Sequence, residues 1–393
     1  MKVGIPKELF PEQRVAIVPS IAVKMIQAGL EVYIETEAGL ASHVTDEHYQ
    51  QVGAKILPTV QSLYEQSDII LKVASPSLNA IHDSYTEIDL LKPKSILIAP
   101  LSPIRYPALV DRLNTKQITA FSLDLLPRIA RAQSMDIMSS MSSVAGYKSI
   151  ILAANYLSKL FPMMTTAAGT ILPAKVIVIG AGVAGLQAIA TARRLGGVVR
   201  AFDTRATTAE QVKSLGADFV SLATEHNVTE DSQGYAKEQS AEFYHHEQEI
   251  LKPYLPETDV LITTALIPGK RAPLLITADM VKEMRPGSVI VDLAIEQSGN
   301  CELTEPGKII VKHGVSVIGL LNLPSLLPVH ASQLYAQNIF SFLHYVLPQL
   351  KATTQEFDFD DDIIKNCLVM HDGEIVHPAV KKTWQTKEKG DVA

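Results

Sequence analysis

Residues 176–187, VIVIGAGVAGLQ, constrain the fold more than any other stretch of this chain. Four apolar residues lead directly into a turn that contains Gly180, Gly182 and Gly185, and a helix-favouring segment follows at once. In such a unit the first glycine allows a tight turn, the second lets the backbone approach a pyrophosphate, and the third lets helix and strand pack closely. The order of strand, glycine turn and helix therefore predicts a dinucleotide site at the N-terminus of the helix.

A carboxylate follows the next predicted strand. Residues 198–202, VVRAF, end at Asp203, which lies 18 residues after Gly185. A carboxylate at this spacing accepts hydrogen bonds from an adenosine ribose and repels a 2′-phosphate, which favours NAD over NADP. Arg205 lies close by and would offset part of that repulsion, so the choice between the two dinucleotides stays open.

Composition excludes several classes of protein. The 393 residues carry a net charge of −7 and are 47% hydrophobic, which indicates a globular protein of more than one domain without a basic surface for nucleic acid. Cys301 and Cys367 make no disulfide framework and fit a reducing cytosol. No apolar run is long enough to span a membrane, and the opening segment has no signal-peptide core. The adjacent residues 245–247, HHE, lack the spacing of metal ligands on one helix face, so we expect no metal site.

Short apolar strands alternate with helical segments along most of the chain. This pattern predicts an α/β protein with two Rossmann-like domains, mostly parallel sheets and a cleft between the domains. We expect residues 1–139 and 327–393 to form an N-terminal α/β domain that a C-terminal helix completes. Residues 140–326 are expected to form the NAD-binding domain, which a helix over residues 147–160 introduces. Asp372-Gly373 predicts a hairpin turn near the end of the chain.

The polar segment LPRIARAQSMDIMSSMSS, residues 126–143, lies directly before the predicted nucleotide domain. A nicotinamide carboxamide needs both a donor and an acceptor, which Gln133, Asp136 and Ser139 offer. Arg128 and Arg131 add forked donors. A polar linker between domains is the alternative interpretation, and the position of the segment favours the binding role.

Arg14 and Lys72 are two further cations of interest. Arg14 precedes an apolar run, and Lys72 ends the apolar segment DIILK. A strand end is where ligands bind in open α/β sheets, so the two could hold an anionic ligand. A salt bridge to a nearby carboxylate would explain the presence of Arg14 and of Lys72 equally well.

Several long motifs resemble the alanine dehydrogenase/transhydrogenase superfamily: PRIARAQSMDIMSS, FPMMTTAAGTILPAKVIVIGAGVAGLQAIATARRLG, TTALIPGKRAP and VDLAIEQSGNCELT. Within it they are similar to the NAD-binding domain I of proton-translocating NAD(P) transhydrogenases, from KVGIPKE to GEIVHP. The resemblance implies a homodimer that binds NAD(H) and exchanges hydride directly with NADP(H) on a partner domain III. A membrane-spanning domain II would carry the protons. Such a component is active only with its partner subunits and lies in the cytoplasm, on the inner face of the plasma membrane.

The resemblance also implies site residues. Catalytic roles would fall to Arg128, Gln133, Asp136 and Ser139. The dinucleotide site would comprise Arg128, Arg131, Gln133, Ser134, Met135, Asp136, Ser139, Gly180, Gly182, Val183, Ala184, Gly185, Asp203, Thr204, Arg205, Gly234, Tyr235 and Leu266. In this set Gly234 and Tyr235 match a loop that closes over the nucleotide, and Leu266 matches the adenosine-side wall.

Alanine dehydrogenase is the main alternative within the superfamily. It would use Arg14 and Lys72 to hold pyruvate, and it needs a histidine as proton donor in a segment resembling LHLAP. Here that segment reads APLSP, and Pro100 can neither donate nor accept a proton. The position of the family's catalytic aspartate is Glu296 here. A regulatory nucleotide sensor on the same scaffold is a third possibility, against which the intact nicotinamide loop counts.

Two further positions depart from the transhydrogenase pattern. QSGN, residues 297–300, replaces a glycine pair. Glu247 stands where a glutamine is usual, a change that bears on nucleotide affinity.

Overall fold

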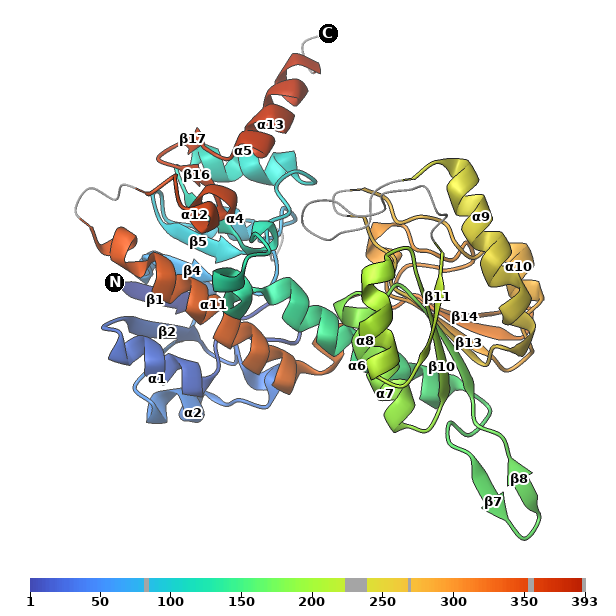
Figure 1. The fold of residues 1–393 in the computed structure, drawn as a ribbon. Helices are drawn as coiled ribbons and strands as arrows, with labels where there is room; N and C mark the ends of the chain where they lie inside the picture. The colour runs from blue at the N-terminus through green and yellow to red at the C-terminus, as the bar shows by residue number, and fades with distance from the viewer. Residues whose placement is uncertain (81–84, 223–238, 268–269, 353–356, 391–393) are drawn as a thin grey trace. The chain divides into compact units, whose positions relative to one another are not determined.

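The computed structural model describes residues 1–80, 85–222, 239–267, 270–352 and 357–390 (Figure 1). The chain divides into two compact units, a first unit of residues 1–141 with 327–393 and a second unit of residues 142–326. The boundaries expected from the sequence, 139/140 and 326/327, lie within two residues of this division. Each unit contains one large, mostly parallel sheet, so the predicted α/β class is confirmed.

The first unit is built on eight strands in the order β17-β16-β6-β5-β4-β1-β2-β3. Neighbouring strands from β3 to β6 are parallel, whereas β16 runs antiparallel to β6 and to β17. The strands are β1 (Lys2–Ile5), β2 (Glu31–Glu35), β3 (Lys55–Leu57), β4 (Ile69–Leu71), β5 (Ile96–Ala99), β6 (Thr119–Ser122), β16 (Leu368–His371) and β17 (Glu374–Ile375). Asp372 and Gly373 join β16 to β17 and both have positive φ, as in a type I′ turn, so the predicted hairpin is confirmed.

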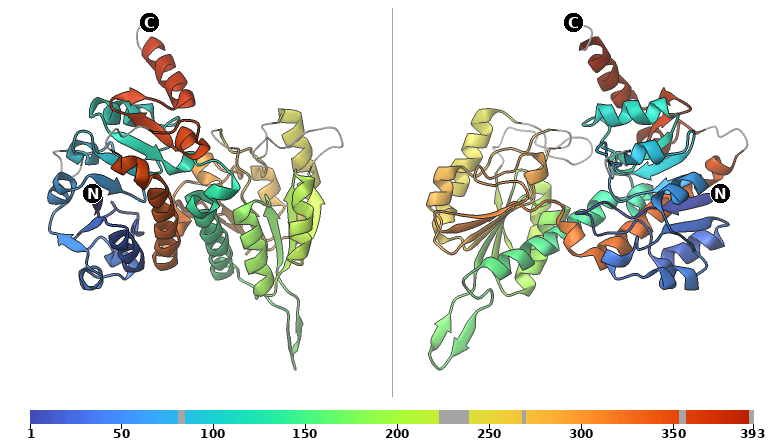
Figure 2. Two further views of the ribbon diagram at one scale, coloured as in Figure 1. Left: turned by 60° about the vertical axis from the view of Figure 1, so that its left-hand side comes forward. Right: turned by 180° about the vertical axis from the view of Figure 1, so that it is seen from behind.

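The helices of the first unit include α11, which follows the whole second unit in sequence. They are α1 (Pro19–Gln27), α2 (Asp46–Gln51), α3 (Val60–Gln66), α4 (Glu87–Leu90), α5 (Pro107–Thr115), α11 (Pro328–Lys351), α12 (Asp362–Cys367) and α13 (Pro378–Gly390). Figure 2 shows α11, in orange, beside the blue N-terminal elements. Its buried face contributes Phe342, whose ring lies 5.4 Å from that of Phe121 on β6, and the C-terminal segment thereby completes the N-terminal core.

The large sheet of the second unit has seven strands in the order β11-β10-β9-β12-β13-β15-β14. They are β9 (Lys175–Ile179), β10 (Val198–Asp203), β11 (Asp218–Ser221), β12 (Val260–Thr263), β13 (Val289–Asp292), β14 (Ile309–Lys312) and β15 (Val315–Ile318). The helices are α7 (Val183–Arg194), α8 (Ala209–Ser214), α9 (Ala241–Leu251) and α10 (Ala278–Lys282). Six strands are parallel and run 3-2-1-4-5-6, so the order reverses between β9 and β12. Ligands bind at such a reversal in open α/β sheets.

The helix expected over residues 147–160 is instead α6 (Ile137–Tyr156), which begins ten residues earlier. The polar segment before it is therefore largely helical, with the 3₁₀ helix η3 (Ala130–Met135) leading into α6. The carboxylate of Asp136 explains the early start, because it accepts a hydrogen bond from the Ser139 N–H at 2.9 Å and so caps the first turn.

A short antiparallel hairpin precedes the glycine turn. It consists of β7 (Met164–Thr166) and β8 (Gly169–Ile171), and Figure 1 shows it extending from the second unit. All six strand residues are exposed. Across the described ranges, no helix is both long and apolar enough to cross a membrane.

Candidate dinucleotide site

The glycine turn between β9 and α7 needs glycine at two of its three positions. Gly180 has a φ of +94°, and a Cβ there would lie 2.5 Å from the Thr264 hydroxyl. A Cβ on Gly185 would lie 1.8 Å from the Gly180 carbonyl oxygen. Thr264 donates a hydrogen bond of 3.0 Å to that same oxygen and so fixes the turn from the end of β12. This role of Thr264 was not predicted, although its position after an apolar strand was visible in the sequence.

Gly182 differs, because among the described residues no atom crowds the position that a Cβ would take there. The nearest described atom to such a Cβ is the Arg205 Nη2, at 4.0 Å. Gly182 is the N-cap of α7, and no side chain of the described residues caps this helix. The N–H groups of Val183, Ala184 and Gly185 belong to the first turn, which has no intrahelical acceptors. An open approach to an uncapped helix N-terminus suits a phosphate group, so a pyrophosphate fits here.

Asp203 ends β10 and lies beside the glycine turn. Its Oδ2 accepts a hydrogen bond from the Ala181 N–H at 2.6 Å, which ties β10 to the turn. Arg205 donates to both carboxylate oxygens, from Nε to Oδ1 at 2.9 Å and from Nη2 to Oδ2 at 2.8 Å. The backbone N–H of Arg205 also donates to Oδ1, at 2.8 Å, so a ribose hydroxyl would have to displace one of these donors. The half-buried Thr204 lies between them in sequence, and the role of all three at the ribose stays a prediction.

Asn300 shapes the loop after β12. Its Oδ1 accepts from the Ala265 N–H at 3.0 Å, and its Nδ2 donates to the Ala265 carbonyl at 2.9 Å. The predicted wall residue Leu266 follows directly and is 39% exposed, so it is available to contact a ligand. Ser298, in the same QSGN segment, has a φ of +83°, a conformation that favours glycine and that explains why a glycine is suited to this turn. From the sequence, Asn300 was noted only as one residue of the QSGN segment, which departs from the transhydrogenase pattern. Gly234 and Tyr235 lie outside the described residues.

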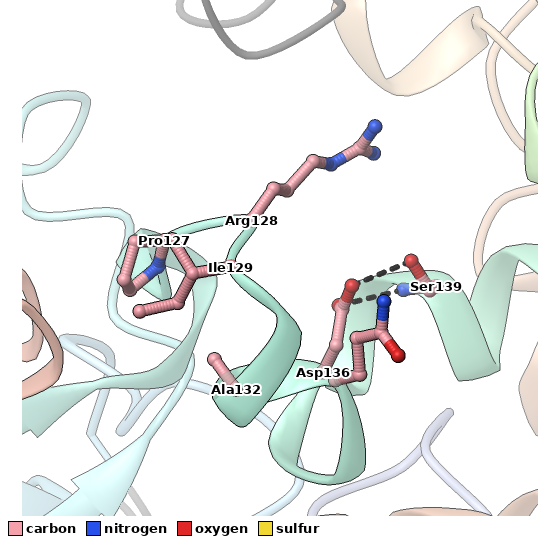
Figure 3. A pocket seen from close by; sticks show the side chains of 7 residues that line it. Pro127, Arg128, Ile129, Ala132, Asp136 and Ser139 are labelled. Atoms are coloured by element: carbon pink, nitrogen blue, oxygen red, sulfur yellow. Dashed lines mark hydrogen bonds between the residues drawn. The ribbon is translucent and has the colours of Figure 1, made fainter.

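The first unit contains a pocket of about 330 Å³ in the segment predicted to hold the nicotinamide (Figure 3). All four predicted catalytic residues line it, and the lining consists of Pro127, Arg128, Ile129, Ala132, Gln133, Asp136 and Ser139. The Asp136 carboxylate also accepts from the Ser139 hydroxyl at 2.5 Å, so these two side chains hold each other in place. Figure 3 shows the Arg128 side chain extending away from this pair.

Three other predicted site residues do not line this pocket. Arg131 forms a salt bridge of 2.9 Å with Asp361 at the N-terminus of α12. The carbonyl of Ser134 accepts from the Asn338 side chain on α11 at 2.9 Å, and Met135 is buried in the core of the first unit. These contacts attach η3 to neighbouring elements, and the binding roles of the three residues stay predictions.

Lys72 and Arg14 are both paired with carboxylates of the chain itself. The Lys72 ammonium is 1% exposed and lies 2.9 Å from Glu8 Oε2 and 2.7 Å from Glu87 Oε1. Burial acts to lower the pKa of Lys72, but the two carboxylates outweigh it and raise this pKa. The Arg14 guanidinium binds Glu12 through Nε at 2.8 Å and Nη2 at 2.7 Å. Of the two interpretations left open by the sequence, the structure shows the salt bridges.

The strand order 3-2-1-4-5-6, with a glycine turn at its reversal, defines an α/β protein of the dinucleotide-binding class. Family models described as "Alanine dehydrogenase/PNT, N-terminal domain" and "Alanine dehydrogenase/PNT, C-terminal domain" match residues 4–145 and 149–378. The chain belongs to the alanine dehydrogenase/PNT family.

Individual relatives of the chain come from two branches of this family, the transhydrogenases and the alanine dehydrogenases. The chain is 46% identical over 384 residues to the first part of NAD(P) transhydrogenase subunit alpha of Rhodospirillum rubrum, covering 97% of this chain and 99% of that protein. A crystal structure of transhydrogenase from Sinorhizobium meliloti matches with a TM-score of 0.82 and 38% identity, over 96% of this chain and 100% of that one. Alanine dehydrogenase of Methanococcus maripaludis is 32% identical over 337 residues, covering 82% of this chain and 81% of the relative. The predicted resemblance is confirmed, and these transhydrogenase chains are the more similar.

Proposed function

We propose that this chain is the NAD(H)-binding component of a proton-translocating NAD(P) transhydrogenase and exchanges hydride directly with NADP(H) on a partner chain. The observation that carries the proposal is the match along nearly the whole length of a relative named as the first part of a transhydrogenase subunit alpha. The geometry of the glycine turn and of the polar pocket supports it.

The second unit would hold the adenosine and pyrophosphate end of the dinucleotide. The pyrophosphate would lie on the N–H groups of Val183, Ala184 and Gly185, where Gly182 leaves room for it. Asp203 would accept from the ribose while it keeps its hydrogen bond to the glycine turn. Three donors on Arg205 already engage that carboxylate, so binding involves a rearrangement of this pair.

The first unit would position the nicotinamide. Bound NADH supplies a hydride from its dihydronicotinamide ring. Transfer between two nicotinamides needs approach and orientation rather than an acid or a base. Asp136 and Ser139 are already fixed by their mutual hydrogen bonds, and with Gln133 they offer an acceptor and donors for the carboxamide from an ordered helix start. Arg128 adds a cation to the same pocket.

The contacts of Lys72 and Arg14 count against amino-acid dehydrogenation. A pyruvate carboxylate would have to displace Glu8 or Glu87 from Lys72 and Glu12 from Arg14, and these carboxylates are buried with their partners. Pro100 supplies no proton donor. The chain alone, given pyruvate, ammonia and NADH, should therefore oxidise no NADH.

The proposal includes a homodimer and membrane-bound partners. The β7–β8 hairpin and the residues that flank it expose apolar side chains, among them Met163 at 63% and Leu172 at 69%. A hairpin of two strands is marginally stable alone, and exposed apolar patches mark interaction surfaces, so a second copy of this chain is the expected cover. The NADP-binding and proton-carrying parts would be partner subunits, which hold this chain on the cytoplasmic face of the membrane.

The proposal is tested by reconstitution. The purified chain is mixed with an NADP(H)-binding transhydrogenase component, and hydride transfer from NADH to an NADP⁺ analogue is followed by absorbance. Transfer that requires both components is expected. An inactive mixture in which both dinucleotides bind their own components would contradict the proposal.

A further inference from the structure

Arg131 belongs to the segment predicted to hold the nicotinamide, yet its guanidinium is bound by side chains of the chain itself. Its Nη1 donates to Asp361 Oδ2 at 2.9 Å and to the Tyr345 hydroxyl at 3.1 Å. The Tyr345 hydroxyl in turn donates to the same oxygen of Asp361. The three side chains thus form a closed triangle of hydrogen bonds, which we call the η3 clamp.

The η3 clamp joins three elements of the first unit. Arg131 lies on η3, Tyr345 lies on α11, and Asp361 is the N-cap of α12. The second carboxylate oxygen of Asp361 has partners of its own, because Oδ1 accepts from the N–H groups of Ile363 at 2.7 Å and Ile364 at 3.3 Å. Asp361 therefore uses one oxygen to cap α12 and the other to hold η3.

A second hydrogen bond from α11 holds η3 one turn further along. The Nδ2 of Asn338 donates to the Ser134 carbonyl at 2.9 Å. Asn338 and Tyr345 are seven residues apart, which is two turns of an α-helix, so they lie on the same side of α11. Arg131 and Ser134 are three residues apart, which is one turn of a 3₁₀ helix. One side of α11 therefore holds both ends of a single turn of η3.

The turn that is held in this way carries residues of the proposed nicotinamide pocket. Gln133 lies between the two points of attachment and lines the pocket, and Asp136 lines it three residues further on. Half of the Arg131 side chain is exposed, and a salt bridge with an exposed partner contributes little to the stability of a fold. We therefore expect the η3 clamp to act on the position of η3 more than on the stability of the unit.

We propose that the η3 clamp positions the nicotinamide pocket for hydride transfer: it holds η3 so that Gln133 and Asp136 orient the nicotinamide. The inference rests on the proposed function. Arg131, Tyr345 and Asp361 are then positioning residues, and Arg131 acts through η3 rather than by touching the dinucleotide. Transfer between two nicotinamides depends on orientation, and a displacement of about 1 Å can slow such a reaction by about 100-fold. The second unit would hold the rest of the dinucleotide, so a loosened η3 lowers the transfer rate more than the affinity for NADH.

The test is a double-mutant cycle on the rate of hydride transfer at saturating NADH, with the full-length chain and an NADP(H)-binding transhydrogenase component. Asp361→Asn can keep the cap of α12 through its Oδ1, while its amide –NH₂ replaces the oxygen that accepts from Arg131. We expect Asp361→Asn and Arg131→Ala each to slow transfer by about tenfold. The double variant should be no slower than either, because both changes remove the same interaction. The Kd for NADH, from nucleotide fluorescence, should stay close to that of the unmodified chain.

Two further variants complete the design. Tyr345→Phe removes only the hydroxyl from a ring that packs against the core, and it should also slow transfer at an unchanged Kd. Lys55→Ala is the matched control, because it removes an exposed salt bridge of 2.9 Å to Glu31, between β3 and β2 of the same unit. It should transfer hydride at the unmodified rate. Thermal unfolding should show every variant folded at the assay temperature.

The outcomes separate this inference from the proposed function. Transfer at the unmodified rate in Asp361→Asn, or a loss that Lys55→Ala shares, overturns the positioning role and leaves the proposed function intact. Weaker NADH binding in Arg131→Ala without any effect of Asp361→Asn overturns it too, and makes Arg131 a direct ligand. Effects that multiply in the double variant also contradict a shared interaction. An unmodified chain that transfers no hydride overturns both.

Discussion

Asp136 has two roles that substitution can separate. It caps α6 and lines the pocket proposed for the nicotinamide. Asparagine caps helices as well as aspartate does, so Asp136→Asn should keep the Tm while it removes the charged acceptor. Hydrogen bonds to charged groups contribute about 1.5–3 kcal/mol, so we expect hydride transfer to slow by roughly 10- to 100-fold. Transfer at the unmodified rate would remove Asp136 from the nicotinamide site.

A matched variant isolates the capping role. Asp136→Ala loses both functions, so its transfer rate should fall and its stability should also fall by about 0.5–2 kcal/mol, the usual effect of losing an N-cap. Comparing the thermal unfolding of Asp136→Asn with that of Asp136→Ala distinguishes the loss of the charged acceptor in the pocket from a destabilised start of α6.

At this scale the sequence predicted which residues matter better than it predicted their partners. Asp136 and Ser139 were proposed as a pair of polar ligands, and they do line one pocket. The partner of Lys72 was not predictable, because Glu8 lies 64 residues away and meets Lys72 only through the folding of the sheet. Arg14 and Glu12 are only two residues apart, so this salt bridge was predictable from the sequence alone.

The glycine turn allows a sharp test at the level of a structural element. In Gly185→Ala the new Cβ would overlap the Gly180 carbonyl, so we expect a poorly folded or strongly destabilised protein. In Gly182→Ala no described atom crowds the new Cβ, so the Tm should change little, while NADH binding weakens because the methyl group occupies the approach of the pyrophosphate. Circular dichroism and NADH titration measure the two effects. Normal NADH affinity in Gly182→Ala would contradict the proposed position of the pyrophosphate.

Local pattern predicted element types well and some boundaries poorly. The apolar strand before the glycine turn and the helix after it lie as predicted. The start of α6 was placed ten residues late because the serines at its beginning indicate a loop, whereas the Asp136 cap stabilises a helix there. The edge strand β14 was missed, since half of its side chains are exposed and its pairing with β15 depends on a turn at His313 and Gly314.

At the scale of the whole molecule, the β7–β8 hairpin with its flanking residues is the surface that we assign to dimerisation. Replacing Met163 and Leu172 together by aspartate adds charge to exposed positions and disturbs no buried contact. We expect a folded monomer by light scattering, in place of a dimer. Phe10→Asp, at a 91% exposed position of the first unit, is the control and should leave the dimer intact. A double variant that remains dimeric would place the interface elsewhere.

The general architecture was predictable because the repeated alternation of strand and helix has few solutions other than parallel sheets covered by helices. The family motifs then indicated the branch. One feature was beyond the sequence: the burial of Glu247, which is 2% exposed. It depends on how α9 packs, which periodicity does not determine.

Direct hydride transfer is tested most sharply by isotope labelling. NADH carrying deuterium at the transferred position is incubated with the purified chain, an NADP-binding transhydrogenase component and NADP⁺, and the NADPH formed is analysed by mass spectrometry. We predict that the NADPH carries the deuterium, with none released to water, and that omission of either protein abolishes transfer. Deuterium lost to solvent, or NADPH formed without this chain, would contradict the role proposed for it.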